Sequence, residues 1–205
     1  MRSMVEGGGV LTRSCARTRT PSVSPAGCHL PTSGEEWRGA WEGIEMIDIF
    51  TTGGTIDKVY FDALSEYQIG PAAIPDMLRE NNVHVPHRVT QLMRKDSLEL
   101  DDADRAAIRA AVAASDAARI LVTHGTDTMV TTARVLADVP GKTIVLTGAM
   151  QPASLRASDA EFNVGFALAA VQTLPPGVHI AMNGMIFDPA RTEKDRAAGR
   201  FRSER

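Results

Sequence analysis

The sequence MIDIFTTGGTI at residues 46–56 joins a short apolar run to a glycine turn and a threonine. Residues 46–51 (MIDIFT) have the length and composition of a buried strand. Gly53 and Gly54 follow, and glycine allows a chain to turn sharply where other residues would be strained. The stretch therefore predicts a first strand with a hydroxyl group, that of Thr55, at its carboxyl end.

Beyond this stretch, short apolar runs alternate with helical patterns. The helix predicted at residues 101–114 is the strongest, because Asp101 or Asp102 can cap it and alanine and arginine fill it. Continuous apolar strands that alternate with helices favour an α/β fold, with a mostly parallel sheet and helices on both faces. The further strands are predicted at residues 88–93, 119–123, 142–147 and 178–182, and the further helices at 72–81, 127–138 and 158–174.

Residues 1–45 differ in composition from the rest of the chain. They are rich in Gly, Ser, Pro, Thr and Arg and lack apolar periodicity, so they bury too little apolar surface to offset the entropy of ordering. They also lack the apolar core of a signal peptide. We therefore predict that residues 1–45 are a disordered or non-native extension, and that the domain occupies residues 46–205.

The overall composition excludes several classes of function. The net charge of −3 is too small to predict a nucleic-acid partner, and no apolar run approaches the roughly 20 residues of a membrane span. Cys15 and Cys28 precede the predicted domain, and no cluster of His, Cys and carboxylates has metal-ligand spacing. The glycine turn matches neither a dinucleotide-binding nor a P-loop pattern. We predict a cytoplasmic protein that binds no metal, cofactor, nucleic acid or membrane.

Two Gly-Thr turns follow different strands of the predicted sheet. The first contains Gly54 and Thr55, and the second, HGTDT at residues 124–128, contains Gly125 and Thr126. We expect both turns at the edge where the carboxyl ends of parallel strands form ligand sites. Glycine lets backbone N–H groups approach a ligand closely, and a hydroxyl beside such donors is typical of acyl transfer.

A threonine hydroxyl needs a base within about 2.6–3.2 Å to act as a nucleophile near neutral pH. Three side chains on loops at this edge are candidates: Lys194, Lys58 and His124. A buried lysine can be neutral and accept a proton. The residues alone leave the choice among the three open.

Other polar residues have structural interpretations. His124 is expected to be structural, with its ring packed beneath the turn, and Asp57 and Lys58 are expected at the surface of a loop. The charged end EKDRAAGRFRSER at residues 193–205 is typical of a solvated, frayed segment. The methionines Met129, Met150 and Met182 are expected in the core.

The motifs TTGGTI (51–56), HGTDTM (124–129) and LTGAMQP (146–152), taken together, resemble those of bacterial-type L-asparaginases. The segment DSLELDDADR (96–105) is similar to a further motif of that family, with Leu100 in place of a methionine. The resemblance continues through SDAEFN (158–163) and covers the whole predicted domain. It implies the fold of the N-terminal domain of an L-asparaginase.

The resemblance also implies catalytic roles. Thr55 matches the nucleophile that attacks the side-chain amide of asparagine. Thr126 and Asp127 match a second catalytic pair, and Lys194 falls where the family has the lysine that works with that pair. Tyr67 matches the tyrosine of the loop that closes over the site. The implied chemistry is attack on the amide, a β-aspartyl-enzyme ester, loss of ammonia and hydrolysis of the ester.

Binding roles follow from the same resemblance. Ser97 matches the hydroxyl that holds the α-carboxylate, and Asp127 matches the carboxylate that binds the α-amino group. Gly54 and Gly125 are expected to bring backbone N–H groups to the substrate. The family usually has a polar residue after this serine, whereas Leu98 stands here, and this departure bears on the choice of substrate.

The sequence ends at Arg205, soon after the lysine. Full-length members of the family have a second, smaller domain, which in a neighbouring subunit supplies an acidic residue near the tyrosine. The chain resembles short asparaginase-like proteins with the small C-terminal domain absent. We therefore expect a homo-oligomer, a dimer or a tetramer, in which a partner subunit helps to close the site.

The leading hypothesis is an amidohydrolase that converts L-asparagine, or L-glutamine, into the acid and ammonia. A second hypothesis is a weakly active or non-catalytic domain that senses aspartate or asparagine, since the binding side chains are present while one activating acid is missing. A third is an amidase subunit of a larger complex.

Overall fold

The computed structural model describes residues 45–62 and 66–203. The predicted extension at residues 1–45 lies outside the described residues, except for Glu45. In the part that is described, no helix combines the length and the apolar character that crossing a membrane requires.

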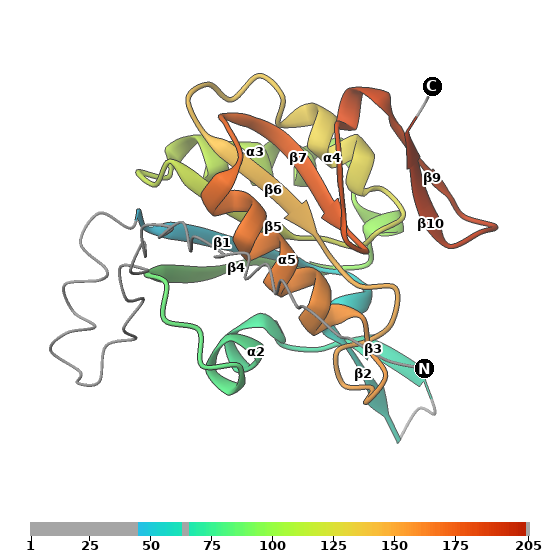
Figure 1. The fold of residues 1–205 in the computed structure, drawn as a ribbon. Coiled ribbons are helices and arrows are strands. Elements are labelled where there is room, and N and C mark those ends of the chain that lie inside the picture. The colour runs from blue at the N-terminus through green and yellow to red at the C-terminus, as the bar shows by residue number, and fades with distance from the viewer. Residues whose placement is uncertain (1–44, 63–65, 204–205) are drawn as a thin grey trace, which may run out of the picture. The chain divides into compact units, whose positions relative to one another are not determined.

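A six-stranded sheet forms the centre of the domain (Figure 1). Five strands are parallel and the last, at the edge, is antiparallel, which confirms the predicted mostly parallel sheet. The order across the sheet is β4 (His87–Lys95), β1 (Ile47–Gly53), β5 (Arg119–Thr123), β6 (Thr143–Thr147), β7 (Gly177–Met182) and β8 (Met185–Phe187).

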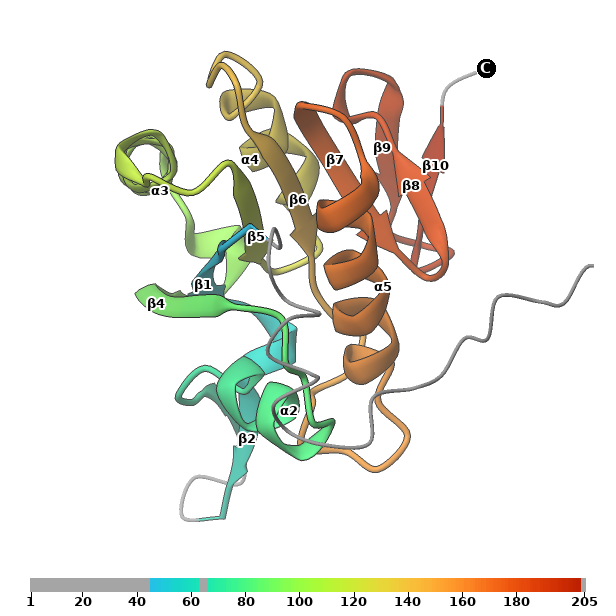
Figure 2. The ribbon, with the colours of Figure 1, turned by 60° about the vertical axis from the view of Figure 1, so that its left-hand side comes forward.

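Helices cover both faces of the sheet, as predicted (Figures 1 and 2). On one face, α2 (Ile74–Glu80) and α5 (Ala160–Thr173) pack over the strands through side chains such as Met77 and Val164. On the other face, α3 (Asp102–Ala114) and α4 (Met129–Val135) pack through side chains such as Ile108 and Met129. Burial of these two apolar layers drives the assembly.

Helix α3 begins with a reciprocal cap. The Asp101 carboxylate accepts the Asp104 N–H at 2.8 Å, and the Asp104 carboxylate accepts the Asp101 N–H at 3.1 Å. Asp101 is therefore the cap, and Asp102, the other candidate, is exposed to solvent. The cap fixes where the helix leaves the loop that follows β4.

The last crossover differs in hand from the other three. The connection from β1 to β4 moves toward the β4 edge of the sheet and passes over the α2 face. The connections β4–α3–β5 and β5–α4–β6 move toward the β8 edge and pass over the opposite face. Reversing both the direction and the face keeps the hand, so these three connections share one hand. The connection β6–α5–β7 also moves toward the β8 edge, but it passes over the α2 face, so its hand is opposite to that of the other three. Parallel crossovers are right-handed almost without exception. The exception carries the loop before α5 over the turn after β1, where the Ala153 N–H reaches Ile56 O at 3.1 Å.

Two antiparallel hairpins were not anticipated. One consists of β2 (Lys58–Phe61) and β3 (Glu66–Ile69), and the other of β9 (Thr192–Asp195) and β10 (Arg200–Ser203). Residues 193–203 of the charged end are not frayed, because Phe201 is buried against Phe187, with ring centroids 5.8 Å apart, although most side chains of this segment are exposed. A single buried aromatic side chain anchors a segment that is otherwise charged.

Candidate active site

The candidate site lies where the strand connections diverge. From β1 the chain turns toward the α2 face, and from its neighbour β5 it turns toward the α4 face. In open α/β sheets, ligands bind beyond the carboxyl ends of the two strands at such a switch point. A short 3-10 turn, η1 (Thr55–Asp57), follows β1, and the turn at residues 124–128 follows β5. Both Gly-Thr turns are therefore at one edge of the sheet.

Glycines allow these loops to touch. Gly54 has φ of +88°, and a Cβ placed on it would collide with Gly125 Cα. A Cβ on Gly125 would lie 2.6 Å from the Ser97 Cβ, and a Cβ on Gly148 would collide with the His124 carbonyl oxygen. The loops after β1, β4, β5 and β6 thus converge at backbone contact, and side chains at these glycines would force them apart.

Lys194 joins the residues of the second turn. Its Nζ lies 2.5 Å from Thr126 Oγ1 and 2.6 Å from Asp127 Oδ1, and its side chain is only 10% exposed. Arg196, which directly follows β9, approaches the same Asp127 oxygen at 3.8 Å and remains exposed. An ammonium, a hydroxyl and a carboxylate, the groups that proton transfer and amine recognition require, are therefore in one cluster.

Thr55 and Ser97 lie on the neighbouring loops. Thr55 begins η1 and is half-buried. Ser97 begins a second 3-10 turn, η2 (Ser97–Glu99), is buried, and has its carbonyl fixed by the Thr128 hydroxyl at 2.7 Å. Among the described residues, no hydrogen bond is made to the Thr55 hydroxyl, so this group is free to face a ligand.

The three candidate bases have different surroundings. His124 is completely buried, and burial lowers the pKa of His124 to about 4, so its ring is neutral. Its Nδ1 donates to Gly125 O at 2.7 Å, and its Nε2 accepts from the Thr132 hydroxyl at 2.8 Å, which uses both nitrogens in holding the turn. Lys58 pairs with Asp96 at 2.8 Å. Only Lys194 contacts a site hydroxyl.

Tyr67 lies on the β2–β3 hairpin. It is 46% exposed and packs against Tyr60 on the facing strand, with ring centroids 5.5 Å apart. Within residues 45–62 and 66–203, no hydrogen bond joins Tyr67 to Thr55. The structure therefore brings the two glycine turns, Ser97 and Lys194 together, but it leaves this tyrosine outside the cluster.

The prediction that Asp57 lies at the surface was wrong. This residue ends η1 and is only 3% exposed, because the loop before α5 and the start of α2 pack over the turn. Burial raises the pKa of Asp57 to about 6, although the Ala73 N–H and the charge of Arg94 both oppose the shift. Lys58, which is 28% exposed, is partly buried.

Two supporting groups were missed in the sequence. Arg134 on α4 donates to Pro189 O at 2.9 Å and to Thr192 O at 3.2 Å, which ties the segment that carries Lys194 to α4. Asp159 accepts from Met150 N at 3.0 Å and so holds the loop after β6. The SDAEFN motif signalled the second group, whereas Arg134 stands in a helical pattern with no distinctive local signal.

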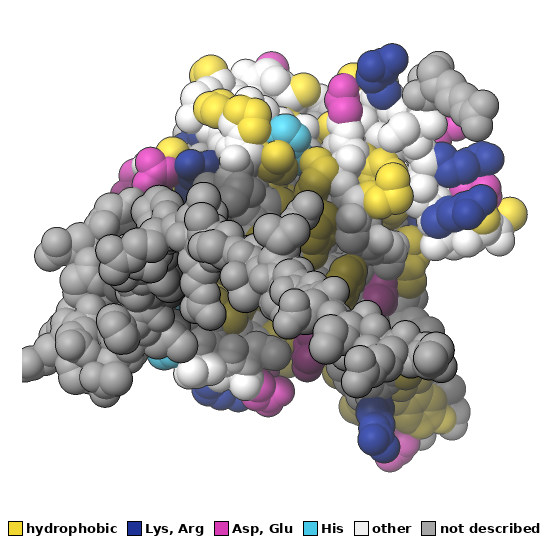
Figure 3. Space-filling view, viewed as in Figure 1, with side chains coloured by type: hydrophobic (Ala, Val, Ile, Leu, Met, Phe, Trp, Pro, Cys, Tyr) yellow, Lys and Arg dark blue, Asp and Glu magenta, His cyan; other side chains and the backbone are white. Residues whose placement is uncertain are grey.

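Charge near the cluster is mixed. Figure 3 shows dark blue basic side chains around the β9–β10 hairpin, and the exposed ones include Arg196, Arg200 and Arg202. The described residues contain no group of three or more His, Cys, Asp or Glu side chains that would hold a metal ion. The arrangement suits a small ligand that carries a carboxylate and an amine.

These features define a doubly wound α/β protein whose site at the switch point is built from hydroxyls, a lysine and a carboxylate. The chain belongs to the asparaginase N-terminal domain family: the family model described as "Asparaginase, N-terminal" matches residues 46–203. The L-asparaginase of Thermococcus kodakarensis is 30% identical over 161 residues, which are 74% of this chain and 48% of that protein.

Solved structures agree with this membership. The thermostable L-asparaginase from Thermococcus kodakarensis superposes with a TM-score of 0.68 at 27% identity, covering 77% of this chain and 51% of the other. L-asparaginase I from Vibrio cholerae superposes with a TM-score of 0.69 at 25% identity, covering 78% of this chain and 51% of the other. A probable cytoplasmic L-asparaginase from Campylobacter jejuni superposes with a TM-score of 0.61 at 26% identity, covering 73% of this chain and 48% of the other. The chain spans about half the length of the relatives it matches.

Proposed function

We propose that this protein is an amidohydrolase that converts L-asparagine into L-aspartate and ammonia, with L-glutamine as a second candidate substrate. The observation that carries the proposal is the Lys194–Thr126–Asp127 cluster beside the Gly54–Gly125 contact. The family membership supports the same substrate class. A cytoplasmic location and a homo-oligomeric state, a dimer or a tetramer, are parts of this proposal.

In the proposed reaction, the Thr55 Oγ attacks the side-chain carbonyl carbon of asparagine. The hydroxyl proton passes through the Thr126–Lys194 pair to the leaving nitrogen, the C–N bond breaks, and ammonia departs. Water then adds to the β-aspartyl ester, its proton returns to Thr55, and aspartate leaves. The Gly54 N–H already donates to Lys95 O at 3.0 Å, so the expected donors to the developing oxyanion are the other backbone N–H groups of the two glycine turns.

Substrate binding is assigned to the neighbouring groups. Ser97 is expected to donate to the α-carboxylate, and Asp127 is expected to accept from the α-amino group. Asp127 already faces two cations, Lys194 and Arg196, so the incoming ammonium must compete with Arg196 for this carboxylate. Tyr67 is expected to act only after the β2–β3 hairpin moves toward Thr55.

A second candidate is a domain that binds aspartate or asparagine without turnover. The specific observation in its favour is that, in the described part of the chain, no base is hydrogen-bonded to the Thr55 hydroxyl. Both candidates require the same binding side chains, so affinity alone does not separate them.

The test is ammonia release from asparagine by the full chain and by Thr55→Ala, Thr126→Ala and the matched control Thr131→Ala, an exposed threonine of α4. Hydrolysis predicts release by the parent and the control and a loss of at least about a hundredfold in the other two. Aspartate binding by calorimetry with no release by the parent chain would identify the sensor instead.

A further inference from the structure

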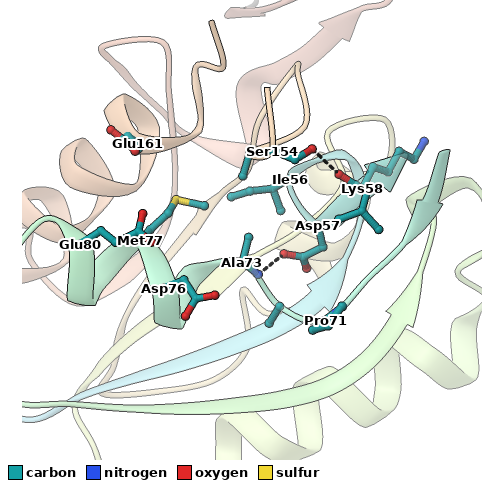
Figure 4. A pocket seen from close by; sticks show the side chains of 13 residues that line it. Ile56, Asp57, Lys58, Pro71, Ala73, Asp76, Met77, Glu80, Ser154 and Glu161 are labelled. Atoms are coloured by element: carbon teal, nitrogen blue, oxygen red, sulfur yellow. Dashed lines mark hydrogen bonds between the residues drawn. The ribbon is translucent and has the colours of Figure 1, made fainter. Parts of the chain in front are cut away.

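A cavity lies beside η1 and is lined by Ile56 and Asp57 of that turn (Figure 4). It has a volume of about 320 Å³, enough for a small organic molecule, and its walls come from η1, α2, the loop at residues 153–154 and the start of α5. The opposite-handed crossover creates it, because α5 would otherwise lie on the far face of the sheet.

The polar part of the wall is acidic. Four of its residues are carboxylic acids: Asp57, Asp76, Glu80 and Glu161. Among the described residues that line the cavity, Lys58 is the only basic one, and its ammonium is already paired with Asp96. Asp76 and Glu80 lie 2.6 Å and 4.0 Å from the guanidinium of Arg79, which leaves Asp57 and Glu161 without an ion-pair partner in the described structure.

Asp57 is the residue that points to a ligand. It is 97% buried, and its Oδ1 accepts the Ala73 N–H at 2.8 Å. Its other oxygen has no hydrogen-bond partner among the described residues, and Asp57 lines the cavity. A carboxylate oxygen that has no partner in the described chain and lines a cavity can accept a hydrogen bond from a donor that enters the cavity.

The rest of the wall is apolar. Ile56, Met77 and Pro71 line the cavity, and the Ser154 hydroxyl, which donates to Lys58 O at 3.1 Å, keeps acceptor capacity. In Figure 4, Asp57 lies on the hairpin side and Glu80 on the helix side, with Met77 beside the latter. The wall thus offers acceptors at two ends and carbon between them.

We propose that this cavity binds an aliphatic diamine, with one ammonium on the free oxygen of Asp57 and the other near Glu80 and Glu161. The apolar middle of such a molecule would lie against Ile56 and Met77. Because Ile56 and Asp57 directly follow Thr55 in η1, occupancy is also expected to change the kcat for asparagine, a consequence that rests on the proposed function.

The experiment is calorimetric titration of the full chain at neutral pH with 1,4-diaminobutane. Butylamine, with one ammonium, and 1,4-butanediol, with none, are the matched ligands. We expect saturable one-to-one binding of the diamine, binding at least about tenfold weaker for butylamine, and no binding of the diol. Since the heat of binding needs no turnover, this readout is independent of whether the protein hydrolyses asparagine.

Variants locate the site. Asp57→Asn keeps the acceptor for Ala73 but removes the charge, and Glu161→Gln removes the acid at the other end; each is expected to weaken diamine binding at least about tenfold. Asp102→Asn, an exposed change on the opposite face, is the matched control and should bind as the parent does. The proposal is overturned if the diamine shows no saturable binding in the millimolar range, if the diol binds equally well, or if folded Asp57→Asn and Glu161→Gln both bind normally.

Discussion

Lys194 Nζ lies 2.5 Å from Thr126 Oγ1, although 68 positions separate the two residues in the chain. Lys194 comes from a hairpin strand, β9, and Thr126 from the turn after a central strand, β5. The contact places an ammonium against a hydroxyl at the edge where the glycine turns meet.

Replacing Lys194 by Met is expected to lower kcat for asparagine by about a hundredfold or more, because general acid-base groups contribute factors of that size. The KM should change less, since the side chains expected to bind the substrate, Ser97 and Asp127, are unchanged, although Asp127 loses its ion pair with Lys194. Steady-state ammonia release gives both constants, and circular dichroism checks the fold. An unchanged kcat in a folded Lys194→Met chain would remove the lysine from the proposed mechanism.

Arg134 is expected to act as a positioning residue for Lys194. Arg134→Met removes the hydrogen bonds to Pro189 O and Thr192 O, so Lys194 should lose its contact with Thr126. Because small misplacements of catalytic groups are costly, we expect kcat to fall about tenfold to a hundredfold with a smaller change in KM.

The matched control for that change is Arg109→Met. Arg109 is a half-buried arginine of α3 whose printed hydrogen bonds, among the described residues, all go to Asp138. Equal losses of kcat in the two variants would mean that Arg134 has no positioning role.

Gly125 is expected to tolerate no side chain. The added methyl of Gly125→Ala would lie 2.6 Å from the Ser97 Cβ, so the variant should lose about 1–3 kcal/mol of stability, as overpacked sites do, together with activity. Gly165→Ala is the control, because nothing lies within 4 Å of the added methyl on this helical glycine. That change should stabilise the chain by up to about 1 kcal/mol. Urea denaturation measures both, and a Gly125→Ala chain as stable as the parent contradicts the packing argument.

Asp57 is expected to make stability fall as the pH rises. Burial raises its folded-state pKa to about 6 from the ordinary value of 3.8, so the folded chain holds a proton that the unfolded chain has lost between these values. The free energy of unfolding should therefore decrease between about pH 4 and pH 6. Above pH 6, Asp57 should cause no further change.

The variant Asp57→Asn does not titrate, so its stability relative to the parent should increase over the same window, by about 3 kcal/mol at most. Denaturation midpoints of both chains, measured at several pH values, test this. If the difference in stability between Asp57→Asn and the parent stays constant with pH, Asp57 does not cause the pH dependence. Glu161→Gln is the control, because it changes an exposed acid, and its stability relative to the parent should vary little with pH.

Local sequence patterns determined the strands of the parallel sheet, the four helices and the two glycine turns. Apolar runs of strand length and a helix cap such as Asp101 depend on contacts within a few residues, so they can be interpreted without the fold. The same patterns located Thr55 and Thr126 at strand ends, and the rule that sites form there brought both to one edge, whereas Ser97 was predicted only from the family resemblance.

Tertiary structure alone decided the rest, because the deciding contacts join distant parts of the chain. The β9–β10 hairpin depends on Phe201 packing on Phe187, and the tertiary structure brings Lys194, rather than Lys58 or His124, against the Thr126 hydroxyl. The hand of the last crossover sets which face α5 covers, and this buries Asp57 in a turn that looks solvent-exposed in the sequence. Burial is a property of what packs over a residue, so no local pattern at Asp57 carried it.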